Sequence, residues 1–202
     1  MAIRATIIRA ASRVAMLGGL LVAGAALAEP EAVPGGEAGV WQEHQTELAY
    51  IGFTSHYSCD GLQEKLELLL RQMGAREGWK VSTYGCDRGF GTPSRFPRAT
   101  LKFSSLQPAD AAAGQPAGTG APAASAATPV IGLWRTVQLS PNHPFSLQDG
   151  DCELMEQFRD KVLPLFATRE QQVKLTCVPH QDIGPFSLQM QVFAPPAPVK
   201  PR

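Results

Sequence analysis

Hydrophobic and polar positions follow two different periods in the first half of the chain. Alternation or short apolar runs indicate strands over 48–54, 79–86 and 98–105. After the first strand, apolar residues recur at offsets of three and four, which is the spacing of one helix face. That stripe consists of Leu62, Leu66, Leu69, Leu70 and Met73. Ser58 or Asp60 is suited to cap the helix, so the pattern predicts the order β-α-β-β.

The second half of the chain repeats this order. Strands are predicted over 133–139, 173–177 and 186–192, and the last of them alternates most regularly. A helix with Asp149 or Asp151 as its cap follows the first strand. Its apolar stripe consists of Met155, Phe158, Val162, Leu165 and Phe166. We therefore expect an α+β fold of two duplicated β-α-β-β units, with the helices packed on an antiparallel or mixed sheet.

Composition sets the boundaries between these units and the other segments. Residues 1–28 have three arginines, no acid, a short apolar run and the ending Ala-Leu-Ala, which is typical of a cleaved signal peptide. The region 107–129 is built from small residues and proline with one charge, which indicates a flexible linker. The expected segments are a leader at 29–44, units at 45–106 and 130–193, and a Pro-rich tail at 194–202.

Charge narrows the classes of partner. The 202 residues contain 18 basic and 18 acidic side chains, and loss of the signal peptide would leave a formal charge of −3. A protein that binds nucleic acid through a general basic surface is therefore not expected. No apolar run reaches the roughly 20 residues of a transmembrane helix, so no membrane anchor is expected after signal cleavage.

The four cysteines are expected to form one disulfide in each unit. In a right-handed β-α-β crossover, the start of the helix and the end of the following parallel strand lie at the same end of the sheet. Each unit has one cysteine at each of these places, which predicts the pairs Cys59–Cys86 and Cys152–Cys177. An exported protein would keep both pairs oxidised.

A metal site is the alternative for the same residues. His56 and Cys59 have H-x-x-C spacing, and Cys177 and His180 have C-x-x-H spacing. Together they would make a Cys2His2 set for zinc or copper. Because disulfides are favoured in an exported protein, we expect no metal ligand and no cofactor.

The sequence contains none of the common catalytic motifs. It lacks G-x-S-x-G, H-E-x-x-H, a P-loop, C-x-x-C, and a G-x-G-x-x-G that follows a strand. The helical carboxylates lie mainly opposite the apolar stripes, so they are expected to be solvated charges. They are Glu64, Glu67, Glu153, Glu156 and Asp160. No catalytic residue is therefore assigned.

One surface combines arginine, aromatic and histidine side chains. In each unit, the loop before the helix and the hairpin before the last strand should leave the sheet at the disulfide end. Arginine mixed with aromatic residues is typical of protein contact sites. The candidate residues are His56, Tyr57, Arg88, Phe90, Arg95, Phe96, His143 and His180.

The signal peptide and the block YSCDGLQEKLELLLRQMGA (57–75), with its partner Cys86, resemble uncharacterised secreted proteins of Gram-negative bacteria. The resemblance implies export and brings no assigned activity. We expect a periplasmic or secreted, non-enzymatic binding protein whose partner is another envelope protein or a peptide. The alternatives are metal handling through His56, His143 and His180, and an unrecognised envelope hydrolase.

Overall fold

The computed structural model describes residues 35–87, 92–113, 129–180 and 185–196. Its elements are β1 (Glu37–Ala49), α1 (Cys59–Gln72), β2 (Lys80–Tyr84), β3 (Arg98–Pro108), α2 (Ala109–Ala113), β4 (Val130–Leu139), α3 (Cys152–Lys161), β5 (Thr168–Leu175) and β6 (Phe186–Ala194). Short 3-10 turns at Asp149–Asp151 and Leu163–Leu165 flank α3. The first half contributes β1 to β3 with α1, and the second half contributes β4 to β6 with α3.

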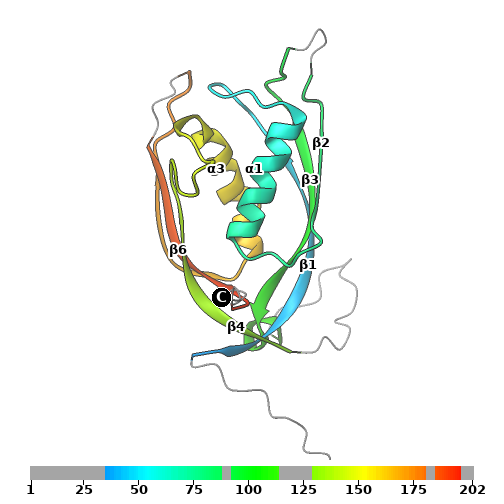
Figure 1. Cartoon of the computed structure of the whole chain (residues 1–202), viewed down its shortest axis with the longest axis vertical. Helices are drawn as coiled ribbons and strands as arrows, with labels where there is room; N and C mark the ends of the chain where they lie inside the picture. The colour runs from blue at the N-terminus through cyan, green and yellow to red at the C-terminus, as the bar shows by residue number, and fades with distance from the viewer. Residues whose placement is uncertain (1–34, 88–91, 114–128, 181–184, 197–202) are drawn as a thin grey trace, which may run out of the picture. The chain divides into compact units, whose positions relative to one another are not determined.

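All six strands belong to one antiparallel sheet in the order β2-β3-β1-β4-β6-β5. The central seam is short, because β1 and β4 pair only between Glu37–Gly39 and Val130–Gly132. Beyond the seam the two halves of the sheet diverge, and α1 and α3 lie between them (Figure 1). The expected α+β class with an antiparallel sheet is confirmed.

Two glycines make the seam possible. A Cβ atom at Gly39 would lie 2.7 Å from the ring of Phe193, and one at Gly132 would lie 2.3 Å from it. The missing side chains leave room for Phe193 and Leu106, both of which are buried. Close packing of this kind leaves no space for even one added methyl group.

Helix α1 forms as its sequence predicts. The Ser58 hydroxyl accepts a hydrogen bond from the Gly61 N–H at 3.1 Å, which satisfies one free donor of the first turn. Gly74 follows the helix with φ +76°, the left-handed conformation that commonly ends a helix. The predicted apolar stripe is completely buried: Leu62, Leu66, Leu69, Leu70 and Met73.

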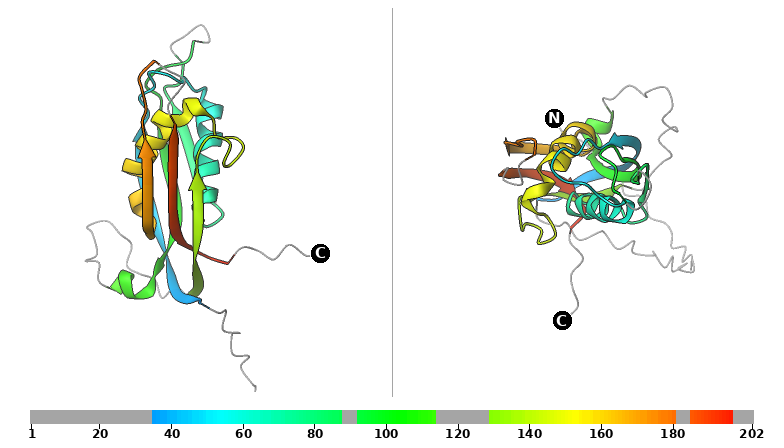
Figure 2. Two further views of the ribbon diagram at one scale, coloured as in Figure 1. Left: turned by 90° about the vertical axis from the view of Figure 1, so that its left-hand side faces the viewer. Right: turned by 90° about the horizontal axis from the view of Figure 1, so that it is seen from above.

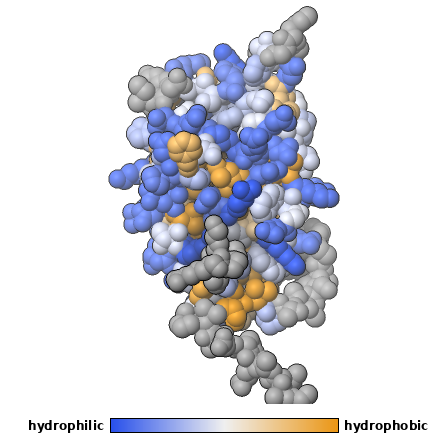
Figure 3. Space-filling model, in the orientation of Figure 1, coloured by the Kyte–Doolittle hydropathy of each residue, from blue (hydrophilic) through white to orange (hydrophobic). Residues whose placement is uncertain are grey.

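The two halves share one hydrophobic core. Buried residues of both helices and both halves of the sheet belong to a single packed cluster. Phe103 of β3 and Phe166 after α3 stack across it, with their ring centroids 5.2 Å apart. Hydrophilic residues predominate on the face shown in Figure 3, and hydrophobic side chains form separate patches there. One sheet and one core exclude two independent small domains for the described residues.

Three predicted boundaries differ from the structure. Strand β1 begins at Glu37, so residues 37–44 belong to the sheet and do not form a flexible leader. Residues 37–39 pair with β4, and the chain from Gly39 onward pairs with β3. The predicted linker starts too early, since Gln107 and Pro108 belong to β3 and residues 109–113 form α2. The signal peptide, the linker residues 114–128 and the tail from 197 lie outside the described residues.

The first and fifth strands also differ from their predicted ends. Beyond Ala49 the chain stays extended but does not belong to β1. Strand β5 starts at Thr168, earlier than predicted, and includes a bulge between Arg169 and Gln172. Val173, an apolar residue of the predicted strand, has 37% of its surface exposed. The physical reason is that α3 packs against β1 and leaves β5 largely uncovered.

Candidate binding surface at the disulfide end

Both predicted disulfides are present. The Cα atoms of Cys59 and Cys86 are 5.3 Å apart, and those of Cys152 and Cys177 are 5.5 Å apart. Strands β1 and β2 both pair antiparallel with β3, so they are parallel to each other, as the topological argument requires. The same holds for β4 and β5 on either side of β6. Two disulfides fit an oxidising or extracellular compartment.

The disulfides use the thiols that the alternative metal site needs. The structure has no free cysteine, so the Cys2His2 set cannot form. Within the described ranges, no group of three or more His, Cys, Asp or Glu side chains is placed to hold a metal ion. Binding of metal by histidines alone stays a prediction.

The segment that follows β1 is held along one edge by the chain before β3. The Tyr50 N–H donates to the Pro97 carbonyl at 2.9 Å, and the Gly52 N–H donates to the Arg95 carbonyl at 2.9 Å. These bonds continue the β1–β3 register, which places Ile51 opposite Phe96. Because opposite residues in an antiparallel pair share a face, these two side chains lie together on the solvent side.

The other edge of this segment is held by side chains of α3. The Gln157 amide accepts from the Ile51 N–H and donates to the Ile51 carbonyl, both at 3.0 Å. One turn earlier, a Glu153 oxygen accepts from the N–H groups of Phe53 at 2.9 Å and Thr54 at 3.0 Å. Gln157 and Glu153 of the second half thus make the hydrogen bonds that a neighbouring strand would otherwise make to this edge of the first half.

The position of Glu153 corrects the sequence prediction. Its helical position indicated a solvated carboxylate, whereas only 6% of the residue is exposed. The first turn of α3 faces the other half of the chain, and the carboxylate is compensated there by backbone donors and by the Thr54 hydroxyl at 3.3 Å. The periodicity of apolar residues within α3 does not indicate that its first turn lies against the other half of the chain.

Asp151, just before α3, forms a second buried link between the halves. It is 3% exposed and accepts from the Lys65 ammonium at 2.6 Å and the Gln148 N–H at 2.8 Å. It also accepts from the Tyr57 hydroxyl. Burial, followed by the negative charge of Asp151, raises the pKa of Tyr57, so the phenol stays protonated and donates. The carboxylate is engaged by three donors, which favours a structural role.

Tyr57 therefore differs from its predicted role. The sequence placed it on the binding surface, but it is 8% exposed and packs edge-on against Tyr50, with ring centroids 5.0 Å apart. Its side chain contributes to the core and to the link with Asp151. A partner at the surface has little of this residue to contact.

Large apolar side chains remain exposed next to these links. The exposed fractions are 44% for Ile51, 43% for Phe53 and 56% for Phe96. His180, from the second half, makes an edge contact with Phe53, with ring centroids 5.9 Å apart. We call these four residues the loop-end surface. Both halves contribute to it, and the bonds to Glu153 and Gln157 fix its backbone.

Five other residues were predicted for the binding surface: His56, Arg88, Phe90, Arg95 and His143. His56, Arg95 and His143 are exposed. Among the described residues, no hydrogen bond, ion pair or ring contact joins the side chains of His56 or His143 to the loop-end surface. Arg88 and Phe90 lie outside the described residues.

Sequence reasoning missed Ile51 and Phe53 as surface residues. The run Tyr50-Ile-Gly-Phe53 carries large apolar groups on both faces of an extended segment. One face must then point to solvent unless another layer covers it. That pattern was the available signal.

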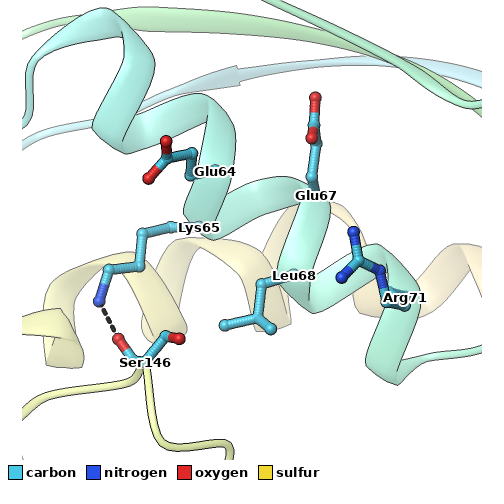
Figure 4. A pocket seen from close by; sticks show the side chains of 6 residues that line it. All are labelled: Glu64, Lys65, Glu67, Leu68, Arg71 and Ser146. Atoms are coloured by element: carbon cyan, nitrogen blue, oxygen red, sulfur yellow. Dashed lines mark hydrogen bonds between the residues drawn. The ribbon is translucent and has the colours of Figure 1, made fainter.

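A shallow pocket of about 270 Å³ lies between α1 and the loop before α3 (Figure 4). It is lined by Glu64, Lys65, Glu67, Leu68, Arg71 and Ser146. The Lys65 ammonium turns to the Ser146 carbonyl (Figure 4) and to Asp151, so it is engaged by the protein itself. The lining acids and bases balance in number and indicate no particular ligand.

Among the histidines that the structure describes, only His44 is hydrogen-bonded to a hydroxyl group. Its Nε2 lies 2.9 Å from the Ser105 hydroxyl, which donates to the Leu165 carbonyl at 2.7 Å. Ser105 has no exposed surface, so a substrate cannot reach its oxygen. A nucleophile needs access and a base that takes its proton, and this pair offers neither.

Scans of the sequence and the structure found no matching family model, no matching curated protein and no matching solved structure. In the part of the chain that the structure describes, no helix has both the length and the apolar character needed to cross a bilayer.

Proposed function

We propose that the chain is an exported, non-enzymatic binding protein of the bacterial envelope, and that its partner is another envelope protein or a peptide. Its sequence starts with the features of a signal peptide, and its disulfides fit an oxidising compartment. No observation favours metal handling or hydrolysis over binding, so those two alternatives stay predictions.

The loop-end surface is the observation that carries this proposal. Its three large apolar side chains are about half exposed, and the backbone of the segment that carries Ile51 and Phe53 is bonded along both edges. Exposed aromatic groups on a fixed backbone lose little conformational entropy when a partner binds. Aromatic side chains are also the groups that contribute most at protein interfaces.

A duplication explains why two halves share this surface. We propose it because four pairs of identical residues are each separated by 93 positions in the sequence. They are Gly39 and Gly132, Trp41 and Trp134, Cys59 and Cys152, and Arg76 and Arg169. Each arginine lies over its own tryptophan, with the guanidinium 5.7 Å and 4.2 Å from the ring centre. Relatives in which only one half keeps this set, with no trace in the other, would contradict the duplication.

A comparative pull-down from periplasmic extract tests the binding function. The oxidised mature chain and its Phe53→Ser and Phe96→Ser variants would serve as baits, with recovered proteins quantified by mass spectrometry. Phe145→Ser is the matched control, because Phe145 is 87% exposed but lies outside the loop-end surface.

We expect a partner that wild type and Phe145→Ser recover equally and that each loop-end variant recovers at least about tenfold less, as for loss of an interface aromatic. The recovered partner, once purified, should bind with the same order of affinities. Equal recovery by all four baits, or recovery of nothing, would count against the proposal.

A further inference from the structure

The outer face of β4, β6 and β5 points away from both helices. The left view of Figure 2 looks onto these three strands, with the helices behind them. Strand pairing places Gln138 opposite Gln189, and Gln189 opposite Gln172, so three glutamines form a row across the three strands. All three are exposed.

Neutral polar residues and two basic residues flank the glutamine row. On one side, Thr136, Gln191 and Arg169 form the next row across the same strands. On the other side, Ser187 is opposite Lys174. The face is therefore rich in amide and hydroxyl groups. The Glu170 carboxylate, in the bulge of β5, is already bonded to the Gln191 amide at 2.6 Å.

The three amides of the row have unused hydrogen-bonding capacity. Within the described residues, no hydrogen bond to the side chains of Gln138, Gln189 or Gln172 is present. Each amide offers two N–H donors and one carbonyl acceptor. Neighbouring strands lie about 4.8 Å apart, so similar polar groups recur at that interval across the face. A ligand with regularly spaced hydroxyl groups, each both donor and acceptor, matches this arrangement.

We propose that this glutamine face binds an uncharged glycan chain. A nucleic acid or an acidic polymer would need more cationic groups than Arg169 and Lys174, and a hydrophobic peptide would need apolar contacts that the row lacks. The glycan lies across the strands, and its hydroxyl groups exchange hydrogen bonds with the three amides. The proposal concerns a different face from the loop-end surface and does not depend on it.

The first half shows that such a row is not a general consequence of the fold. In the corresponding row, β1 contributes Gln45, but β3 and β2 contribute Lys102 and Lys80, which lie directly opposite each other. Gln45 precedes Gln138 by the same 93 positions as the matched residues above. This makes Gln45→Ala a matched control for Gln138→Ala.

Nuclear magnetic resonance titration of the oxidised mature chain tests the proposal. The probes are three neutral tetrasaccharides: chitotetraose, cellotetraose and maltotetraose. We expect at least one of them to shift the side-chain amide signals of Gln138, Gln172 and Gln189 saturably, with a Kd of about 1 mM or tighter. Each Gln→Ala change in the row should weaken binding about fivefold, the effect of one neutral hydrogen bond.

As the control, Gln45→Ala should bind the sugar as wild type does. All variants should keep the dispersed spectrum of the folded chain. The absence of saturable shifts with all three sugars at about 10 mM, ten times the expected Kd, would overturn the proposal. So would shifts that persist unchanged in Gln138→Ala and Gln189→Ala, or self-association through the row in place of sugar binding.

Discussion

The two halves of the molecule have the same order of elements but use their helices differently. Helix α1 packs against β2 of its own half, whereas α3 packs against β1 of the other half. As a result β2 lies under a helix, and every side chain of β5 from Arg169 to Lys174 is exposed. The start of α3 supplies Glu153 and Gln157 to the backbone of the first half. In return α1 supplies only one side chain, Lys65, to the Ser146 carbonyl and the Asp151 carboxylate, among the hydrogen bonds of the described residues.

This difference indicates a division of roles. The first half contributes most of the loop-end surface, and the second half holds that surface in place through polar side chains. Buried polar links require a defined geometry, since an unpaired carboxylate or amide in the interior is costly. Two halves with the same order of elements thus differ in role, since one presents most of the surface residues and the other fixes their backbone.

The largest expected effect comes from the disulfides. Replacing either cysteine pair with serine should lower the free energy of unfolding by about 3.5 kcal/mol, the chain-entropy value for loops of this length. Loss of Cys152–Cys177 should also accelerate hydrogen exchange in β5. Loss of Cys59–Cys86 should not accelerate exchange in β2, because α1 still covers that strand. Urea denaturation and exchange measurements check both parts. Equal acceleration in β2 and β5 would contradict the asymmetry.

The second prediction concerns the buried ion pair between the halves. Asp151→Asn should destabilise the protein by about 3 kcal/mol, because it leaves the largely buried Lys65 ammonium without its counter-charge. Adding Lys65→Met should restore a substantial part of that loss. Glu47→Gln, which breaks the exposed pair with Arg98, should leave the urea midpoint almost unchanged. Similar losses from the buried and the exposed pair would show that Asp151 does not link the halves.

A smaller effect is expected at the start of α3. Glu153→Ala should cost about 2 kcal/mol, since it leaves the N–H groups of Phe53 and Thr54 without their acceptor. Asp60 occupies the matching place at the start of α1 and is exposed, so Asp60→Ala should change stability by less than about 0.5 kcal/mol. Thermal or urea denaturation of the two variants side by side would measure the difference. Equal effects would place Glu153 among ordinary helix-terminal acids.

The smallest effect depends on pH. Burial lowers the pKa of His44 below its ordinary value of 6.5, so the unfolded chain takes up the proton first. Stability should therefore fall as the pH drops below 6.5, until the lowered pKa of the folded state is reached. Val137 stands at the matching place in β4, and His44→Val should remove this part of the pH dependence. An unchanged pH profile in that variant would contradict the assignment.

Local signals in the sequence were sufficient for α1 and the disulfides. The stripe predicted for the second helix extends to Phe166, whereas α3 ends at Lys161. The stripe of α1 and its Ser58 cap depend on neighbours along the chain, and the cysteine pairing follows from the handedness of one crossover. The strand predicted over 48–54 overlaps β1 only at Leu48 and Ala49. Most of β1 was missed because its inward positions include Gln42, His44 and Thr46. Such polar residues conceal the alternation that marks a strand, although His44 finds a partner in Ser105.

The candidate surface was predicted only in part, for a similar reason. Phe96 and His180 were expected at the disulfide end because topology brings those loops there. The contributions of Glu153 and Gln157 depend on α3 approaching the other half, and no spacing within α3 indicates that approach. Tyr57 was assigned to the surface because a sequence does not show whether an aromatic side chain folds inward.

Amide hydrogen exchange at Phe53 and Thr54 tests most directly whether the second half holds the loop-end surface in place. In the wild type, both N–H groups should exchange as slowly as those of neighbouring β3. In Glu153→Ala they should exchange at least about tenfold faster, while β3 keeps its protection. Rapid exchange of both groups in the wild type, or exchange that Glu153→Ala leaves unchanged, would contradict the account.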